Sequence, residues 1–152
     1  MTYNDILRRL RYAFNFNDDK MIAIFKLGGL ETTREVISNW LRKDEDQGFQ
    51  LIKDVEAAMF LNGLIVEKRG AKDGATPAAE ECLSNNLVLL KLKIALNMKD
   101  SDILEVMELS DFKVGKHELS ALFRKKGHIN YRDCEDQFLR NFLKGLQKKI
   151  RP

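Results

Sequence analysis

The strongest constraint on this 152-residue chain is that its sequence occurs twice. Residues 4–69 align with residues 86–151 at a constant offset of 82 positions, without a gap, and 16 of the 66 aligned positions are identical. The identical pairs include Leu7/Leu89, Leu10/Leu92, Ala13/Ala95, Asn15/Asn97, Asp18/Asp100, Leu27/Leu109, Asp54/Asp136, Phe60/Phe142 and Gly63/Gly145. A match of this length indicates a tandem duplication. Because only two long copies exist, the sequence predicts two similar small domains rather than a solenoid.

Each copy has the apolar periodicity of helices. In the first helix of the two copies the apolar positions are Ile6, Leu7, Leu10 and Phe14, and Val88, Leu89, Leu92 and Leu96. These residues share one face at helical spacing, and no stretch alternates with the period of two expected of a strand. Thr32 and Glu35 have the spacing of a capping box and predict the start of a third helix. We therefore expect an all-α fold with about four helices in each copy.

The composition between the copies predicts a linker. The stretch "RGAKDGATPAAEE" holds two glycines, four alanines and Pro77, the only proline inside the chain. Such a stretch favours irregular structure over a packed element. We therefore divide the chain into a first helical repeat (1–69), a linker (70–84) and a second helical repeat (85–152).

The residues that the two copies share have a structural explanation. Leu10, Ala13 and Leu27 are expected to face a core, whereas Asn15 and Asp18 are expected to shape and cap a helix junction. Short polar side chains do this because their oxygens accept hydrogen bonds from free backbone N–H groups. A ligand site present in both copies is the alternative, and we favour the structural explanation.

The composition is that of a globular chain that does not cross a membrane. Hydrophobic residues make up 44% and charged residues 32%. No apolar run approaches the roughly 20 residues that a membrane-spanning helix needs. Charges interrupt the N-terminal apolar stretch "MTYNDILRRLRY", which is not expected of a signal peptide. Cys82 and Cys134 stand alone and are expected to stay reduced. We therefore expect a cytoplasmic protein.

Positive charge is concentrated in the second copy. Residues 1–69 carry 11 basic and 11 acidic side chains, whereas residues 85–152 carry 14 basic and nine acidic ones. No acidic residue follows Asp136. This asymmetry is compatible with an anionic partner for the second copy, but a surplus this small more often means only a solvated surface.

The chain has none of the motifs that would indicate an enzyme. GxSxG, GxxxxGK[ST] and GxGxxG are absent, and His117 and His128 lack the partners of a metal site or a proton relay. Gly28 and Gly29 are better explained as a helix stop than as a phosphate-binding loop. We expect no enzymatic activity, cofactor, metal or small-molecule substrate.

Two groups of residues are candidates for contact with nucleic acid. The segment "KMIAIFKLGGLETTREVISNWL" is similar to a helix-turn-helix, whose second helix enters the major groove. Its glycine turn is missing from the second copy, and its Ile-Ser pair lies two residues too far from the turn. The candidate contacts at the third helices of the two copies are Arg34, Asn39, Arg42 and Lys43, and Arg124 and Lys125.

The second group is a basic stripe on the C-terminal helix. Arg140, Lys144, Lys148 and Arg151 fall within an arc of about 80° on a helical projection. A stripe of this kind could neutralise phosphates. At the equivalent positions the first copy has only one basic residue, so a solvated helix face is the favoured alternative.

The competing interpretation is a protein-binding or self-associating module. Two equivalent helical copies offer an internal twofold contact or a cleft between them. Phe16, Phe49 and Tyr131 are aromatic residues in expected loops, and they are candidates for a seam between the copies. Of the two interpretations we favour the binding or oligomerisation module, with nucleic-acid binding as the alternative.

The same segments resemble a known family. "LGGLETTREVISNWL" and "SDFKVGKHELSALFRKKGHINYRDCEDQFLRNFLKGL", together with the linker and "FLNGLIVEKRG", resemble the YehS-like family of bacterial proteins over essentially the whole chain. The resemblance implies a bacterial cytoplasmic protein built from tandem copies of one domain. It carries over no activity, ligand, partner or catalytic residue.

Overall fold

The computed structural model describes residues 1–70 and 78–152, and every regular element in them is a helix. The helices are α1 (Tyr3–Phe14), α2 (Asp18–Leu27), α3 (Arg34–Leu41), α4 (Asp54–Arg69), α5 (Asn85–Ala95), α6 (Asp100–Leu109), α7 (Lys116–Leu122) and α8 (Asp136–Ile150). Helices α1–α4 and α5–α8 follow one another at the same spacing in the two repeats. The predicted all-α duplication with four helices per copy is confirmed. Residues 71–77 of the predicted linker lie outside the described residues.

Local hydrogen bonds explain where the helices begin and end. Asn15 ends α1 in the left-handed conformation, with φ of 56°, and its equivalent Asn97 has φ of 52°. Asn tolerates this conformation better than most residues, which explains why it occurs in both copies. The cap of α2 is Asn17 rather than the predicted Asp18. Likewise Thr33 caps α3, one residue after the predicted Thr32.

The apolar faces meet in one continuous core that draws residues from both repeats. Leu10 and Ala13 are buried, as predicted, with exposed fractions of 1% and 2%. Leu27 is 38% exposed and its equivalent Leu109 is 43% exposed, so the prediction that they face the core is wrong. Each is the last residue of its helix and lies off the face through which α2 and α6 pack.

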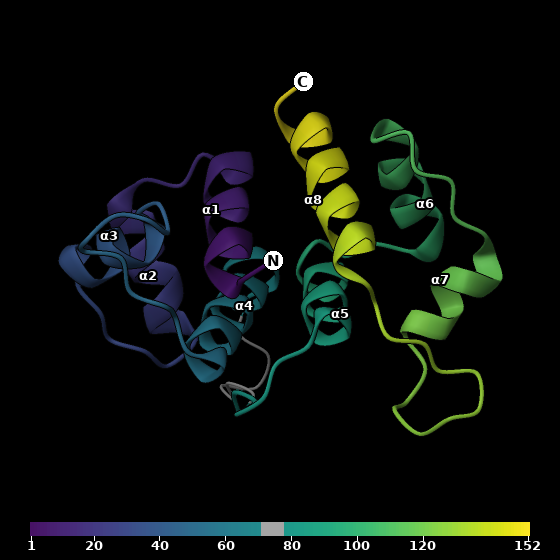
Figure 1. Ribbon diagram of the computed structural model, residues 1–152, viewed down its shortest axis with the longest axis horizontal. Helices are drawn as coiled ribbons and strands as arrows, with labels where there is room; N and C mark the ends of the chain where they lie inside the picture. The colour runs from purple at the N-terminus through teal and green to yellow at the C-terminus, as the bar shows by residue number, and fades with distance from the viewer. Residues whose placement is uncertain (71–77) are drawn as a thin grey trace.

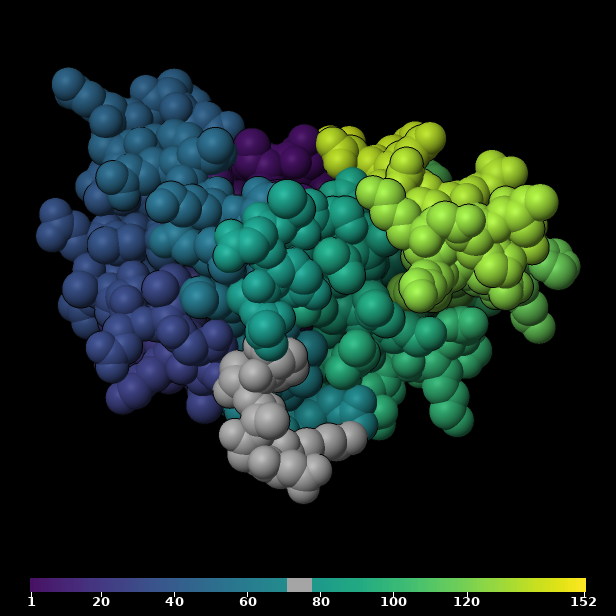
Figure 2. Space-filling model, turned by 90° about the horizontal axis from the view of Figure 1, so that it is seen from below, coloured from purple at the N-terminus to yellow at the C-terminus, as the bar shows by residue number. Residues whose placement is uncertain are grey.

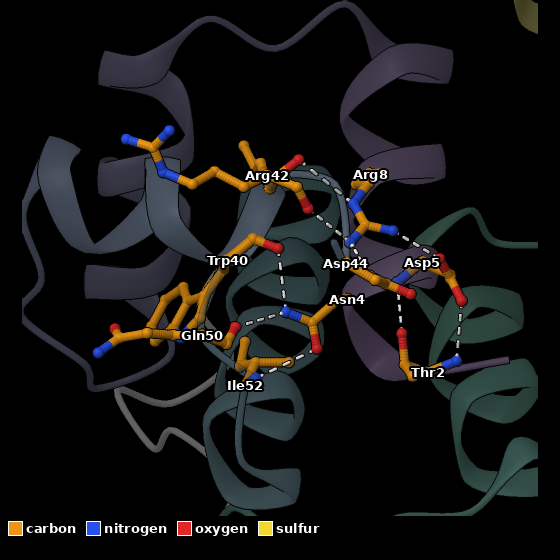
Figure 3. Close-up of polar contacts among 10 residues, drawn as sticks. Thr2, Asn4, Asp5, Arg8, Trp40, Arg42, Asp44, Gln50 and Ile52 are labelled. Carbon is orange, nitrogen blue, oxygen red and sulfur yellow. Dashed lines mark hydrogen bonds and ion pairs between the residues drawn. The ribbon is translucent and has the colours of Figure 1, made fainter. Parts of the chain in front are cut away.

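A buried asparagine holds the connection between the third and fourth helices of each repeat. The Asn4 side-chain amide donates to the carbonyls of Trp40 and Gln50, both at 2.9 Å, and its oxygen accepts from the Ile52 N–H at 3.1 Å (Figure 3). In the second repeat the corresponding bonds join Asn86 to Leu122 O, Arg132 O and Cys134 N. The shared asparagine therefore fixes both ends of this connection in both repeats.

The repeats pack through equivalent helices across an approximate twofold axis. Helix α1 packs against α8 and α4 packs against α5, and these four helices form the centre of the molecule (Figure 1). Arg151, just after α8, donates to Tyr12 O at 2.8 Å, and its equivalent Arg69 donates to Ile94 O at 3.2 Å. Each repeat thus caps the first helix of the other, which is the reciprocity of a twofold contact.

The remaining helices lie at the two ends of the molecule. Helices α2 and α3 are at one end and α6 and α7 at the other (Figure 1). Seen from below, the blue helices of the first repeat and the green and yellow part of the second repeat lie on opposite sides of α5 (Figure 2). The central α1–α8 and α4–α5 pairs therefore join the repeats, and the end helices are free to differ between them.

The aromatic residues predicted for the seam serve their own repeats instead. Phe16 stacks on Phe14 with 5.2 Å between ring centroids. Phe49 lies 5.9 Å below the Arg8 guanidinium, and the Tyr131 hydroxyl donates to Asp133 at 2.8 Å. Phe16 lies in the turn between α1 and α2, and Phe49 and Tyr131 lie in the loops after α3 and α7. The contacts between the repeats are instead those of the four central helices.

Candidate binding site in the second repeat

The predicted contacts at α3 are largely engaged within the protein. Arg34 lies 3.5 Å from Asp18 and 3.6 Å from Asp19 in two ion pairs, and Arg42 donates to the Asn39 side chain at 3.1 Å. Lys43 is exposed. The connection between α2 and α3 has six residues, 28–33, whereas a helix-turn-helix has a turn of three or four.

The basic stripe on α8 divides into two parts. All four side chains are exposed, but Lys148 donates to Leu109 O at 3.2 Å and Arg151 donates to Tyr12 O. Arg140 and Lys144 have no hydrogen bond or ion pair with the described residues. Hydrogen bonds from Asn85 and from the amino group of Met1, with a smaller contribution from the Arg140 charge, hold the pKa of Asp136 below its ordinary value.

The two central helix pairs, α1 with α8 and α5 with α4, differ in charge. Helices α1 and α8 together carry seven basic and two acidic residues, whereas the equivalent pair α5 and α4 carries four basic and three acidic residues. The backbone arrangement of the two pairs is the same, so the side chains alone create this difference. The α1–α8 pair is therefore a positively charged surface that the twofold relation does not explain.

The second repeat has an open hollow of about 1050 Å³ beside α7. Its walls come from α7, from the loop that joins α7 to α8, from the first turn of α8 and from the connection between α6 and α7. In Figure 1 this loop, lime green, extends away from the helices. This loop contains two of the residues predicted from the sequence to contact nucleic acid, Arg124 and Lys125. Arg124 lines the hollow, and Lys125 is next to it in the chain. The lining includes Phe112, His117, Arg124, Ile129, Tyr131 and Phe138.

In the first repeat Arg8 holds the equivalent loop against the helices (Figure 3). Its guanidinium donates to the carbonyls of Leu41 at 3.3 Å and Arg42 at 2.7 Å, and it forms ion pairs with Asp44 at 2.7 Å and Asp5 at 2.6 Å. A planar guanidinium can serve several acceptors at once because its five N–H groups point outward in one plane. One side chain therefore ties the chain after α3 to α1.

The second repeat lacks the charged side chains of this clamp. The residue equivalent to Arg8 is Leu90, which is 37% exposed, and the residue equivalent to Asp44 is Lys126. Leucine offers no donor to the carbonyls, and Lys126 offers no carboxylate. Because Asn86 still fixes Leu122 and Arg132, the loop ends stay in place while the segment between them is unclamped. Neither Leu90 nor Lys126 lines the hollow, so the missing clamp is a separate feature of the same loop.

The hollow combines apolar walls with charges of both signs. Phe112 and Phe138 meet edge to face with 6.0 Å between centroids, and Ile129 at the rim is 93% exposed. Burial and the neighbouring Asp133 raise the pKa of Tyr131. No group of three or more potential metal ligands occurs within residues 1–70 and 78–152. The arrangement is suited to holding an apolar side chain with polar neighbours.

Sequence reasoning about single motifs missed Phe112, Ile129 and Phe138. A signal that could have directed attention to the neighbouring loop was present in the repeat alignment, in which Arg8 is opposite Leu90 and Asp44 is opposite Lys126. Without knowledge of the contacts of Arg8, each of these pairs looks like an ordinary sequence difference between the two repeats. A comparison of the copies for lost ion-pairing residues would have pointed to the loop after α7.

The boundaries of the two repeats coincide with a family model. The model described as "Protein of unknown function (DUF1456)" matches twice, at residues 3–70 and 85–151. The chain belongs to the DUF1456 family. Each DUF1456 match covers one set of four helices, from α1 to α4 and from α5 to α8. The YehS-like resemblance is thereby confirmed at the level of the family.

One DUF1456-type relative covers nearly the whole chain. The chain is 47% identical over 148 residues to "Uncharacterized protein YehS" of Escherichia coli (strain K12). The aligned region covers 96% of this chain and 94% of YehS. No solved structure matches the chain. Among the described helices, none has the length and apolar character needed to span a bilayer.

Proposed function

We propose that this protein is a non-enzymatic module that binds a polypeptide through the hollow of its second repeat. The observation that carries the proposal is the hollow, whose aromatic and charged lining lies beside a loop that lacks the Arg8 clamp of the first repeat. The first repeat then completes the shared core and supports the binding repeat. Two free cysteines suit a cytoplasmic location, which is also part of the proposal.

The lining of the hollow supports a polypeptide as its occupant. Phe112 and Phe138 offer aromatic surface to an apolar side chain, and the exposed Ile129 extends that surface at the rim. Aromatic anchors of this kind dominate protein interfaces. The charged lining residues Arg124 and Asp133 are of opposite sign, which suits the mixed polar groups of a peptide better than a uniformly anionic backbone.

Site-specific photo-crosslinking tests this proposal. A photoreactive residue is placed at Ile129 or, as a matched control, at the equivalent loop residue Gln47 of the first repeat. We expect a discrete adduct with one protein in cell lysate from position 129 and none from position 47. The captured protein, once purified, is then expected to bind the wild type and to bind an Ile129→Asp variant at least tenfold more weakly.

Three outcomes of this experiment contradict the proposal. Equal labelling at positions 129 and 47 would show that the hollow confers no selectivity. An adduct with a second copy of the chain would show that the hollow serves self-association and not binding of a different protein. Binding that is unchanged by Ile129→Asp would move the contact elsewhere. The non-enzymatic part fails separately if a screen of hydrolase, transferase and redox substrates finds turnover that a point mutation abolishes.

Nucleic-acid binding is the second candidate function, and the charge of the α1–α8 surface favours it. This helix pair carries five more basic than acidic residues, against one more for the equivalent α4–α5 pair. Contacts to phosphates would release counterions and make binding fall steeply with salt. The hollow plays no part in this candidate, so the two functions are tested independently.

A further inference from the structure

We propose that Arg9 on α1 and Lys144 on α8 form a binding site for a phosphate oxyanion. The proposal deepens the second candidate function and rests on the same α1–α8 surface. It assigns the contact to one level of the helix pair rather than to the whole basic stripe. It also holds for a small phosphate ligand if no nucleic acid binds.

The contacts at the two ends of the pair place Arg9 and Lys144 at the same level. Helices α1 and α8 lie side by side and run in the same direction (Figure 1). At the start of α8, Asp136 lies 2.9 Å from the amino nitrogen of Met1, and beyond its end Arg151 donates to Tyr12 O. The middle of α8, where Lys144 lies, is therefore beside the middle of α1, where Arg9 lies.

The equivalent residues of the α4–α5 pair show how side chains at this level meet. Lys91 corresponds to Arg9 and Asn62 corresponds to Lys144. The Lys91 ammonium donates a hydrogen bond to the Asn62 side-chain oxygen at 2.6 Å. It also forms an ion pair with Glu80 at 3.1 Å, and this second contact does not have the geometry of a hydrogen bond. Lys91 is only 8% exposed. In this pair one cation meets a neutral acceptor and a carboxylate.

At the α1–α8 pair the same level holds two cations and no acceptor. Arg9 is half-buried, Lys144 is exposed, and neither makes a hydrogen bond or ion pair with the described residues. The acidic residues of the two helices are already engaged: Asp5 pairs with Arg8, and Asp136 accepts from Asn85 and from the Met1 amino group. In one pair Asn62 and Glu80 contact the cation, whereas in the other pair a second cation, Lys144, replaces Asn62, and a bound anion would supply the acceptor.

A phosphate oxyanion fits this arrangement. Two cations at one level of adjacent helices repel each other, and a bridging anion converts that repulsion into two attractions. A guanidinium binds two phosphate oxygens in parallel, while an ammonium acts as a compact charge on a third. Arg140, one turn before Lys144 on α8, adds positive charge and has no ion pair of its own among the described residues.

Titration calorimetry with pyrophosphate tests the site, with two variants that each remove one positive charge from the wild-type protein. Lys144→Asn copies the residue found at the equivalent position, Asn62. Lys149→Asn, the control, removes an exposed lysine from the same helix. We expect Lys144→Asn to weaken pyrophosphate binding about tenfold, the loss of one charge-assisted contact, and Lys149→Asn to change it less than about twofold. Circular dichroism is used to check that both variants fold.

A second arm with a short single-stranded DNA and a short RNA distinguishes the source of the phosphate. If pyrophosphate binds and both oligonucleotides fail, the site stands and nucleic-acid binding is rejected. If the oligonucleotides also bind and weaken with Lys144→Asn, the site serves nucleic acid. The proposal is overturned if wild-type protein does not bind pyrophosphate at low salt, or if Lys144→Asn and Lys149→Asn weaken it equally.

Discussion

Replacing Gly63 with alanine is expected to destabilise the protein by roughly 3 kcal/mol or more, which is at the severe end for one methyl group. A Cβ atom at this position would lie 1.8 Å from the carbonyl oxygen of Ile24. The obstacle is the backbone of α2, so no side chain can turn aside to make room. Helices α2 and α4 would have to separate along their contact. Urea denaturation followed by circular dichroism measures the loss.

The second repeat supplies a replicate of this experiment. A Cβ atom at Gly145 would lie 2.1 Å from the carbonyl oxygen of Val106, and we expect a loss of similar size. Gly115 is the control, because its nearest neighbour would be a Glu118 oxygen at 3.6 Å and its φ of −82° suits any residue. Gly115→Ala should change stability by less than about 0.5 kcal/mol. If Gly63→Ala and Gly115→Ala were equally stable, the close helix contact would be refuted.

Replacing Asn4 or Asn86 with leucine is expected to cost roughly 3–5 kcal/mol, because each change leaves buried backbone groups without partners. For Asn4 these groups are the carbonyls of Trp40 and Gln50 and the N–H of Ile52. Leucine keeps the volume but offers neither donor nor acceptor. Chemical denaturation measures the loss, and hydrogen exchange is expected to accelerate first in the connection before α4.

Asn141→Leu is the matched control for the two asparagines. Its side chain donates to Gln137 O, one turn earlier in α8, at an exposed position. Removing that bond should cost less than about 0.5 kcal/mol, because water and the helix itself satisfy the carbonyl. A loss at Asn4 or Asn86 no larger than this would mean that the connection is held by something else.

The sequence predicted the elements of this fold better than their partners. Apolar periodicity and the duplication predicted eight helices in two sets, and burial of Leu10 and Ala13 followed directly. Periodicity identifies a helix face, but it does not say which helix covers that face. The pairing of α1 with α8 and of α4 with α5 therefore emerged only in three dimensions. Leu27 was assigned to the core because it is apolar and shared, although it lies off the packed face of α2.

The candidate site was harder to predict because no sequence motif marks its residues. Charge patterns directed attention to the α8 stripe, yet Lys148 and Arg151 proved to donate to carbonyls of neighbouring helices. The hollow lies beside the loop that lacks the Arg8 clamp, and Leu90, which replaces Arg8, itself carries no sign of a site. Arg9 was overlooked because its lack of a partner among the described residues is visible only beside the satisfied Lys91.

Every comparison between equivalent residues depends on the two repeats forming one body around a shared core. Two natural reporters test this claim. Trp40, the only tryptophan of the chain, is 3% exposed in the first repeat. Cys134 is 5% exposed in the second repeat, and burial, with the nearby Asp136 and Glu135, raises the pKa of its thiol to about 12. A raised pKa keeps the thiol protonated and unreactive while the repeat is folded.

The most direct measurement follows both reporters through one urea titration. A Cys82→Ser variant removes the exposed thiol and leaves Cys134 as the single target of a pulsed thiol reagent. Trp40 fluorescence then reports unfolding of the first repeat, and Cys134 labelling reports unfolding of the second. One shared core predicts that the two transitions coincide in midpoint and steepness. Separate midpoints, with Cys134 still protected after the Trp40 transition is complete, would contradict the account.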